Sequence, residues 1–131
     1  NGLLDLCENQ DIGVICRTPL CFGFLTGEYS TGHSFDLDDH RATWSAAQLD
    51  SWASAGRLFA SSLSNDNQQS PAQIALRFCL SHPGVSTVIP GMLNRKEVDE
   101  NTAASEMEQL SDVDLPKAKQ IYDEHEFFVR T

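Results

Sequence analysis

Basic residues are scarce in this sequence. Nine lysines and arginines stand against nineteen aspartates and glutamates among 131 residues, and the formal net charge is −10. Ten of the acidic residues lie between Glu97 and Glu126. Because such a surface repels phosphate backbones and anionic lipids, we expect neither a nucleic-acid partner nor a membrane partner.

Long hydrophobic runs are also missing. No apolar stretch approaches the roughly 20 residues that cross a bilayer, and no basic segment followed by an apolar one opens the chain. The first residues, including Leu3, Leu4 and Leu6, already have the pattern of a helix interior. This pattern predicts a piece of a longer protein.

Cysteine motifs are absent as well. The four cysteines (Cys7, Cys16, Cys21 and Cys79) form no C-x-x-C pair, and the histidines are scattered. We therefore expect reduced thiols in a cytoplasmic protein, with no metal site. The sequence has no GxGxxG fingerprint and no P-loop, which excludes the common phosphate-binding motifs.

What is present is an alternation of helical and extended patterns over the length of one domain, residues 1–131. Two short apolar runs, 12–16 and 86–89, predict strands buried on both faces of a parallel sheet. Helical patterns occupy residues 3–9, 49–63, 70–80, 94–104 and 111–122, with a break at 64–67. The fold class is therefore α/β, although two strands alone cannot cover the edges of a sheet.

Two helices carry clear start signals. Ser70-Pro71-Ala72-Gln73 and Asn94-Arg95-Lys96-Glu97 both have a cap residue followed three positions later by a glutamine or glutamate. In the last helix a single apolar face is predicted for Leu115, Ala118, Ile121 and Tyr122.

The stretch 19–45 has no period but contains glycines and several aromatic residues, so we expect an ordered, packed loop. Within it, Asp38, Asp39 and His40 are interpreted as solvated side chains rather than catalytic ones.

The segment STVIPGMLNRKEVDEN, residues 86–101, runs from a strand through Pro90-Gly91 directly into a capped helix. Such a corner turns backbone N–H groups and a helix N-terminus toward an anion. The alternative is a strand, turn and helix that pack together and bind nothing.

Two longer stretches, GVICRTPLCFGFLTGEY (13–29) and ALRFCLSHPGVSTVIPGMLNRKEVDEN (75–101), resemble the C-terminal part of an aldo-keto reductase, as does FDLDDHR (35–41). The resemblance covers nearly the whole chain. It implies a partial (β/α)₈ TIM barrel: the last two strands with their helices, and the C-terminal extra helix.

The resemblance also implies NADP(H) as cofactor, with a set of residues that bind it. Those expected near the pyrophosphate are Thr18, Pro19, Leu20, Cys21 and Phe22. Those expected near the 2′-phosphate and adenine are Gly91, Leu93, Glu97, Glu100 and Asn101.

The chain departs from the family pattern at Glu28, Leu93 and Glu97, where family members often have groups that neutralise or bind phosphate. Two carboxylates at these positions repel phosphate, so weak NADP(H) binding is expected. The family's acid tyrosine and its supporting residues come from earlier strands, and neither Tyr29 nor Tyr122 matches that position. No catalytic residue is therefore assigned.

Two functional hypotheses follow. In the first, the chain belongs to an NAD(P)H-dependent reductase of aldehydes and ketones, supplies the cofactor corner, and is inactive without an N-terminal half. In the second, it is a non-catalytic α/β module that covers its open strands by self-association.

Overall fold

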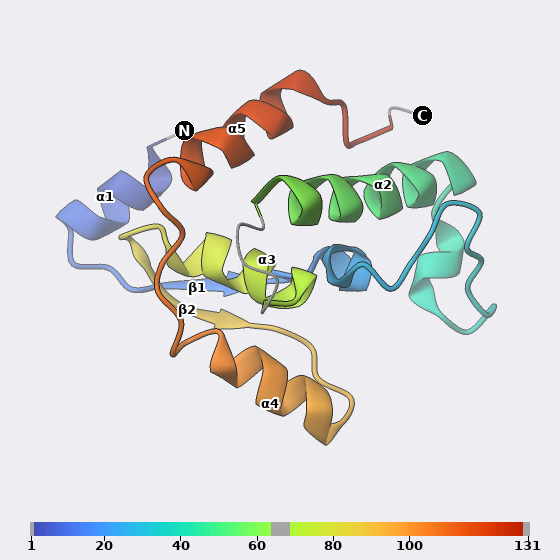
Figure 1. Ribbon diagram of the computed structural model, residues 1–131, viewed down its shortest axis with the longest axis horizontal. Helices are drawn as coiled ribbons and strands as arrows, with labels where there is room; N and C mark the ends of the chain where they lie inside the picture. The colour runs from blue at the N-terminus through green and yellow to red at the C-terminus, as the bar shows by residue number, and fades with distance from the viewer. Residues whose placement is uncertain (1, 64–68, 130–131) are drawn as a thin grey trace.

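The computed structural model describes residues 2–63 and 69–129 (Figure 1). Its α-helices and strands are α1 (Leu3–Asn9), β1 (Val14–Arg17), α2 (Ala46–Leu63), α3 (Pro71–Leu80), β2 (Val85–Ile89), α4 (Arg95–Ala103) and α5 (Asp114–Glu124). Two 3₁₀ helices, η1 (Cys21–Thr26) and η2 (His40–Thr43), lie between β1 and α2. The predicted order of elements is confirmed, while the predicted break at 64–67 lies outside the described residues.

The two strands form a parallel pair. Val14 pairs with Val85 and Cys16 with Val88, and the register shifts after Val14. At the shift the Ser86 hydroxyl accepts a hydrogen bond from the Val14 N–H at 3.1 Å. The first strand begins two residues later than predicted, because Ile12 and Gly13 lie between the turn that follows α1 and the strand.

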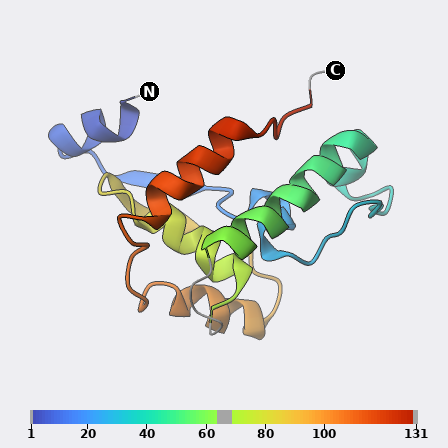
Figure 2. The same ribbon diagram turned by 45° about the horizontal axis from the view of Figure 1, so that its top comes forward.

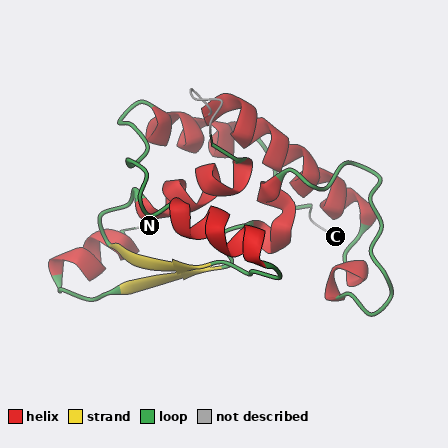
Figure 3. Cartoon of the chain, turned by 60° about the horizontal axis from the view of Figure 1, so that its bottom comes forward, coloured by secondary structure: helices red, strands yellow, loops and turns green. Residues whose placement is uncertain are grey.

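The prediction that both strands are buried on both faces is wrong. Cys16 and Val88 are half-buried on the face that packs against α3, whereas Ile15 and Ile89 on the opposite face are 63% and 56% exposed. Figure 3 shows the two strands at one margin of the molecule, with the helices on one side of them. A short apolar run predicts a strand, but the number of layers around it depends on the rest of the fold.

The predicted helix starts are confirmed. The Ser70 hydroxyl accepts from the Gln73 N–H at 3.2 Å, and the Gln73 side chain accepts from the Ser70 N–H at 3.0 Å. Asn94 caps α4 by accepting from the Glu97 N–H at 3.0 Å. Each cap satisfies backbone donors that a helix start leaves unpaired.

Among the described residues, buried hydrophobic side chains form two clusters. Helix α3 contacts β2, α2, α4 and η1. The first cluster holds the loop and consists of Phe24, Leu49 and Ala53, with Tyr29, Phe35, Trp44 and Trp52 packed against them. The second joins α2, α3 and α5 and consists of Leu63, Ile74 and Ala118, with Phe59 and Phe78 around them. The long loop is therefore ordered and packed, as predicted.

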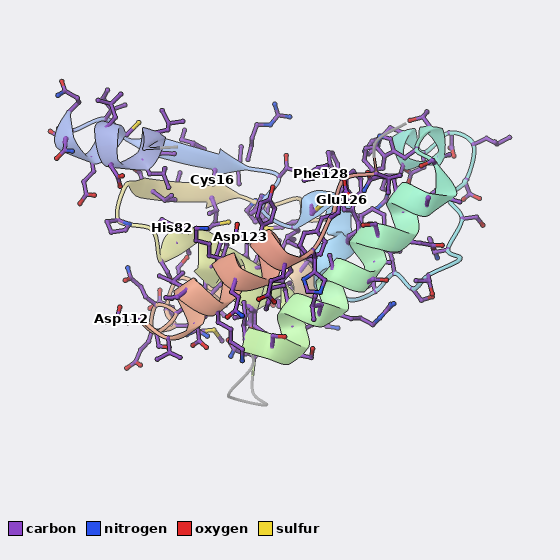
Figure 4. The ribbon with its side chains drawn as sticks, turned by 90° about the horizontal axis from the view of Figure 1, so that it is seen from above. Cys16, His82, Asp112, Asp123, Glu126 and Phe128 are labelled. Atoms are coloured by element: carbon purple, nitrogen blue, oxygen red, sulfur yellow. The ribbon has the colours of Figure 1, made fainter. Side chains whose placement is uncertain are left out.

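Helix α5 lies alongside α2 (Figure 2). Ala118 and Ile121 are buried in this contact, but Tyr122 is 55% exposed, so its predicted place on the apolar face is wrong. Beyond the C-terminal end of α5, where Figure 4 places Phe128, the chain returns to α2. There the Gln48 amide donates to the Phe127 carbonyl and accepts from the Val129 N–H, both at 2.8 Å.

None of the helices in the described part of the chain is long and apolar enough to cross a bilayer.

Candidate functional site

A groove of about 550 Å³ opens between the loop after β1 and the start of α4, and we call it the β1–α4 groove. Nine of the ten residues predicted to bind a cofactor line it: Thr18, Pro19, Leu20, Phe22, Gly91, Leu93, Glu97, Glu100 and Asn101. Cys21 does not line it. Burial of the Cys21 thiol raises its pKa from 9.0 to about 11, so it stays protonated near neutral pH.

The loop that forms one wall has an unusual backbone. Thr18, Cys21 and Phe22 have φ values of 57°, 46° and 56°, and Gly23 follows at 93°. Positive φ is rare for a residue with a side chain, above all for a β-branched one, and persists only where the surroundings enforce it. The loop therefore contains three strained residues, whose conformation its surroundings must enforce.

Aromatic packing holds the strained loop in place. The Phe22 ring lies 4.7 Å from the Trp44 ring and 6.0 Å from the Trp52 ring, measured between centroids. Phe24 is 1% exposed and anchors the loop in the first core cluster.

Arg41 fastens the same loop by charge and hydrogen bonds. Its Nη1 donates to the Phe22 carbonyl and to the Tyr29 hydroxyl, both at 2.9 Å. Its Nη2 donates to Asp39 Oδ2 at 2.6 Å, and the guanidinium lies 4.1 Å from the centroid of the Phe35 ring. Sequence reasoning missed this role, although the stretch FDLDDHR holds both Asp39 and Arg41.

The interpretation of Asp39 as a solvated residue is wrong. Its side chain is 24% exposed, and hydrogen bonds from Arg41 lower its pKa from 3.8 to about 2. Asp38 and His40 are exposed, as predicted, and the His40 ring packs 5.7 Å from the Phe22 ring.

Asp39→Asn is expected to remove part of the acid sensitivity of the fold. The pKa of Asp39 is lower in the folded state than in the unfolded state. The contribution of its carboxylate to stability is therefore fully present above pH 3.8 and is lost as the pH falls through about 2. Urea unfolding at decreasing pH should show the variant less stable than the wild type at pH 6, with the gap closing toward pH 2. Asp38→Asn is the control, and a gap that does not depend on pH would contradict the assignment.

The opposite wall of the groove is the start of α4. Glu97 Oε2 accepts from the Leu93 N–H at 2.7 Å, and Glu97 Oε1 accepts from Asn94 Nδ2 at 2.7 Å. A Cβ on Gly91 would meet no atom within 4 Å, so the space in front of this glycine is open. The wall therefore combines an open backbone turn with a carboxylate that is already hydrogen-bonded.

Side chains of both charges line the groove. Lys96 and Arg41 lie on its lining together with Glu28, Glu97 and Glu100. Within the described ranges, no group of three or more His, Cys, Asp or Glu residues has the geometry to hold a metal ion. The groove is suited to an organic ligand held by backbone groups and a few charged side chains.

Comparison with known proteins shows the family of the chain. The model of the aldo/keto reductase family matches residues 1–123. The chain belongs to the aldo/keto reductase family. Its relatives include L-glyceraldehyde 3-phosphate reductase of Escherichia coli K12, 32% identical over 79% of this chain and 32% of that protein. The aldo-keto reductase yakc [NADP(+)] of Schizosaccharomyces pombe is 27% identical over 95% of this chain and 37% of that protein.

A solved structure agrees on the fold. The aldo-keto reductase AKR11C1 from Bacillus halodurans, in its holo form, superposes with a TM-score of 0.61 at 20% identity, covering 97% of this chain and 38% of that chain. This aldo/keto reductase chain thus spans about a third of the length of the relatives that it matches.

Proposed function

We propose that the chain forms the dinucleotide-binding side of an NAD(P)H-dependent aldo-keto reductase that reduces aldehydes or ketones. In this proposal β1 and β2 are the last two strands of a (β/α)₈ barrel, and α5 is the C-terminal extra helix. The observation that supports it most is that two segments far apart in the sequence, 18–22 and 91–101, supply opposite walls of one groove. The four free thiols support a cytoplasmic location.

The β1–α4 groove fits a dinucleotide. Its volume of about 550 Å³ lies within the range of small-molecule sites. At one end the strained loop of Thr18 and Phe22 would contact the pyrophosphate, close to the Arg41 guanidinium. At the other end, Glu100 and Asn101 would contact the adenine, and the open turn at Gly91 lets the ligand approach the backbone closely.

When bound, the dinucleotide supplies the hydride that reduces the carbonyl carbon. The residues of this chain bind and orient the cofactor in this proposal, and none is assigned as the proton donor. Tyr29 does line the groove, but Arg41 donates a hydrogen bond to its hydroxyl within the first core cluster. Because carbonyl reduction needs an acid next to the carbonyl oxygen, we expect the 131-residue chain to bind dinucleotide without turnover.

Isothermal titration of the 131-residue chain with NADH and NADPH tests the proposal. We expect saturable binding of at least one dinucleotide, with a Kd of about 10⁻⁵ to 10⁻⁴ M because only part of the site is present. Gly91→Leu places a side chain in the open space in front of this turn and should weaken binding about tenfold or more. Ser54→Leu introduces the same residue at an exposed position of α2 and should leave binding unchanged.

Absence of binding by a folded chain would contradict the proposal. Steady turnover of an aldehyde would contradict the assignment of no proton donor, and loss of that turnover in Tyr29→Phe would then identify the donor.

The alternative is a self-associating module, and one observation favours it: the open sheet face with exposed Ile15 and Ile89. A second copy of the chain would cover this face. Size-exclusion chromatography over a range of concentrations distinguishes the two functions, since a reversible dimer that ignores dinucleotide would support the alternative.

A further inference from the structure

We infer that the β1–α4 groove selects a nicotinamide dinucleotide without the additional ribose phosphate, NAD(H) over NADP(H), and that the Glu97 carboxylate is the discriminating group. The inference rests on the proposed function. It is carried by the hydrogen-bond donors and the charges at the α4 end of the groove.

Several hydrogen-bond donors around the start of α4 already have partners within the chain. A helix start normally offers free N–H groups to an anion. Here the Glu97 N–H donates to Asn94 Oδ1 at 3.0 Å, and the Leu93 N–H donates to Glu97 Oε2 at 2.7 Å. The Asn94 amide also donates to Glu97 Oε1 at 2.7 Å. A phosphate arriving at the Leu93 N–H would have to displace a carboxylate that two donors, the Leu93 N–H and the Asn94 amide, hold in place.

The start of α3, which also borders the groove, is capped as well. Ala72, in the first turn of α3, lines the groove. The Ser70 side chain accepts from the Gln73 N–H, and the Gln73 side chain accepts from the Ser70 N–H. At both starts the N–H three residues after the cap donates to the cap side chain, so it is not free for an extra phosphate.

The charges at the α4 end also disfavour a phosphate. Glu97 and Glu100 line the groove there, with Lys96 as the neighbouring cation. Arg95 lies on the same helix, but its Nε is 3.6 Å from Asp99 Oδ2 in an exposed pair, outside the groove lining. A ribose phosphate adds up to two negative charges, whereas a ribose hydroxyl adds none. The carboxylates thus weaken the binding of NADP(H), which carries the phosphate, more than the binding of NAD(H).

Titration of the 131-residue chain with NADH and NADPH in parallel, at one low salt concentration, measures the selectivity. We expect NADH to bind at least about tenfold more tightly, the size of one nearby charge repulsion at a protein surface. Glu97→Gln keeps the shape and removes the charge, so the ratio should fall about fivefold or more, through tighter NADPH binding. Asp99→Asn removes the same charge from the same helix outside the groove, and the ratio should stay within about twofold.

A second readout does not depend on the cofactor. The amide resonance of Leu93 in a ¹H–¹⁵N spectrum should move in Glu97→Gln and stay in place in Asp99→Asn, because only Glu97 accepts from that N–H.

Three results would overturn the inference while the proposed function stands: NADPH bound as tightly as NADH, a ratio that Glu97→Gln leaves unchanged, or a Leu93 resonance that stays in place in Glu97→Gln. If a folded chain binds neither dinucleotide, the proposed function fails and the inference fails with it.

Discussion

Phe24→Ala is expected to lower the free energy of unfolding by about 4 kcal/mol, the loss typical of a buried phenylalanine replaced by alanine. Phe24 is 1% exposed, and its ring lies 5.3 to 6.0 Å from the rings of Tyr29, Trp52 and Phe35. Its removal leaves a cavity in the cluster that holds the strained loop. Urea unfolding followed by circular dichroism measures the loss.

Phe128→Ala makes the same chemical change at a position that is 59% exposed and should cost less than about 1 kcal/mol. If Phe24→Ala does not fold, Phe24→Leu gives a smaller loss that is still measurable. Equal losses for Phe24→Ala and Phe128→Ala would show that the first core cluster does not carry the stability assigned to it.

Gly56→Ala is expected to destabilise the fold by about 2 to 3 kcal/mol, although alanine is the better helix former by about 1 kcal/mol. A Cβ at Gly56 would lie 2.1 Å from the backbone carbonyl oxygen of Phe24, and α2 and η1 would have to separate. The helix can approach the loop this closely only because residue 56 has no side chain. The same displacement would move the loop wall of the β1–α4 groove.

The midpoint of urea unfolding should fall in Gly56→Ala with little change in slope, since the unfolded chain is the same length and the core is the same. Ser54→Ala, an exposed position of the same helix, serves as the control and should be neutral or slightly stabilising. A Gly56→Ala chain as stable as the wild type would mean that the helix and the loop are not in contact.

Features determined by neighbouring residues were predictable from the sequence. The caps at Ser70 and Asn94 need only residues within one helical turn, and both side chains accept from the N–H three positions later, as predicted. The ten residues proposed for the cofactor site came from a family resemblance, and the structure brings nine of them to one groove.

Features that depend on distant partners were not predictable. Burial of Ile15 and Ile89 depends on what covers each face of the sheet, and a short apolar run carries no information about that. The contacts of Arg41 with Phe22 and Tyr29 connect loop segments whose paths have no sequence period. The contact of Glu97 with the Leu93 N–H uses the same carboxylate that a capping pattern would direct to the Asn94 N–H, and the turn geometry decides between them.

The aromatic packing around Phe22 gives this chain an internal optical probe. Its two tryptophans, Trp44 and Trp52, are the two indole rings in contact with Phe22. Indole emission is sensitive to the polarity and mobility of its surroundings, so a shift of the loop would change the colour and intensity of the light emitted. The movement of one wall of the groove can thus be followed in real time without attaching a dye.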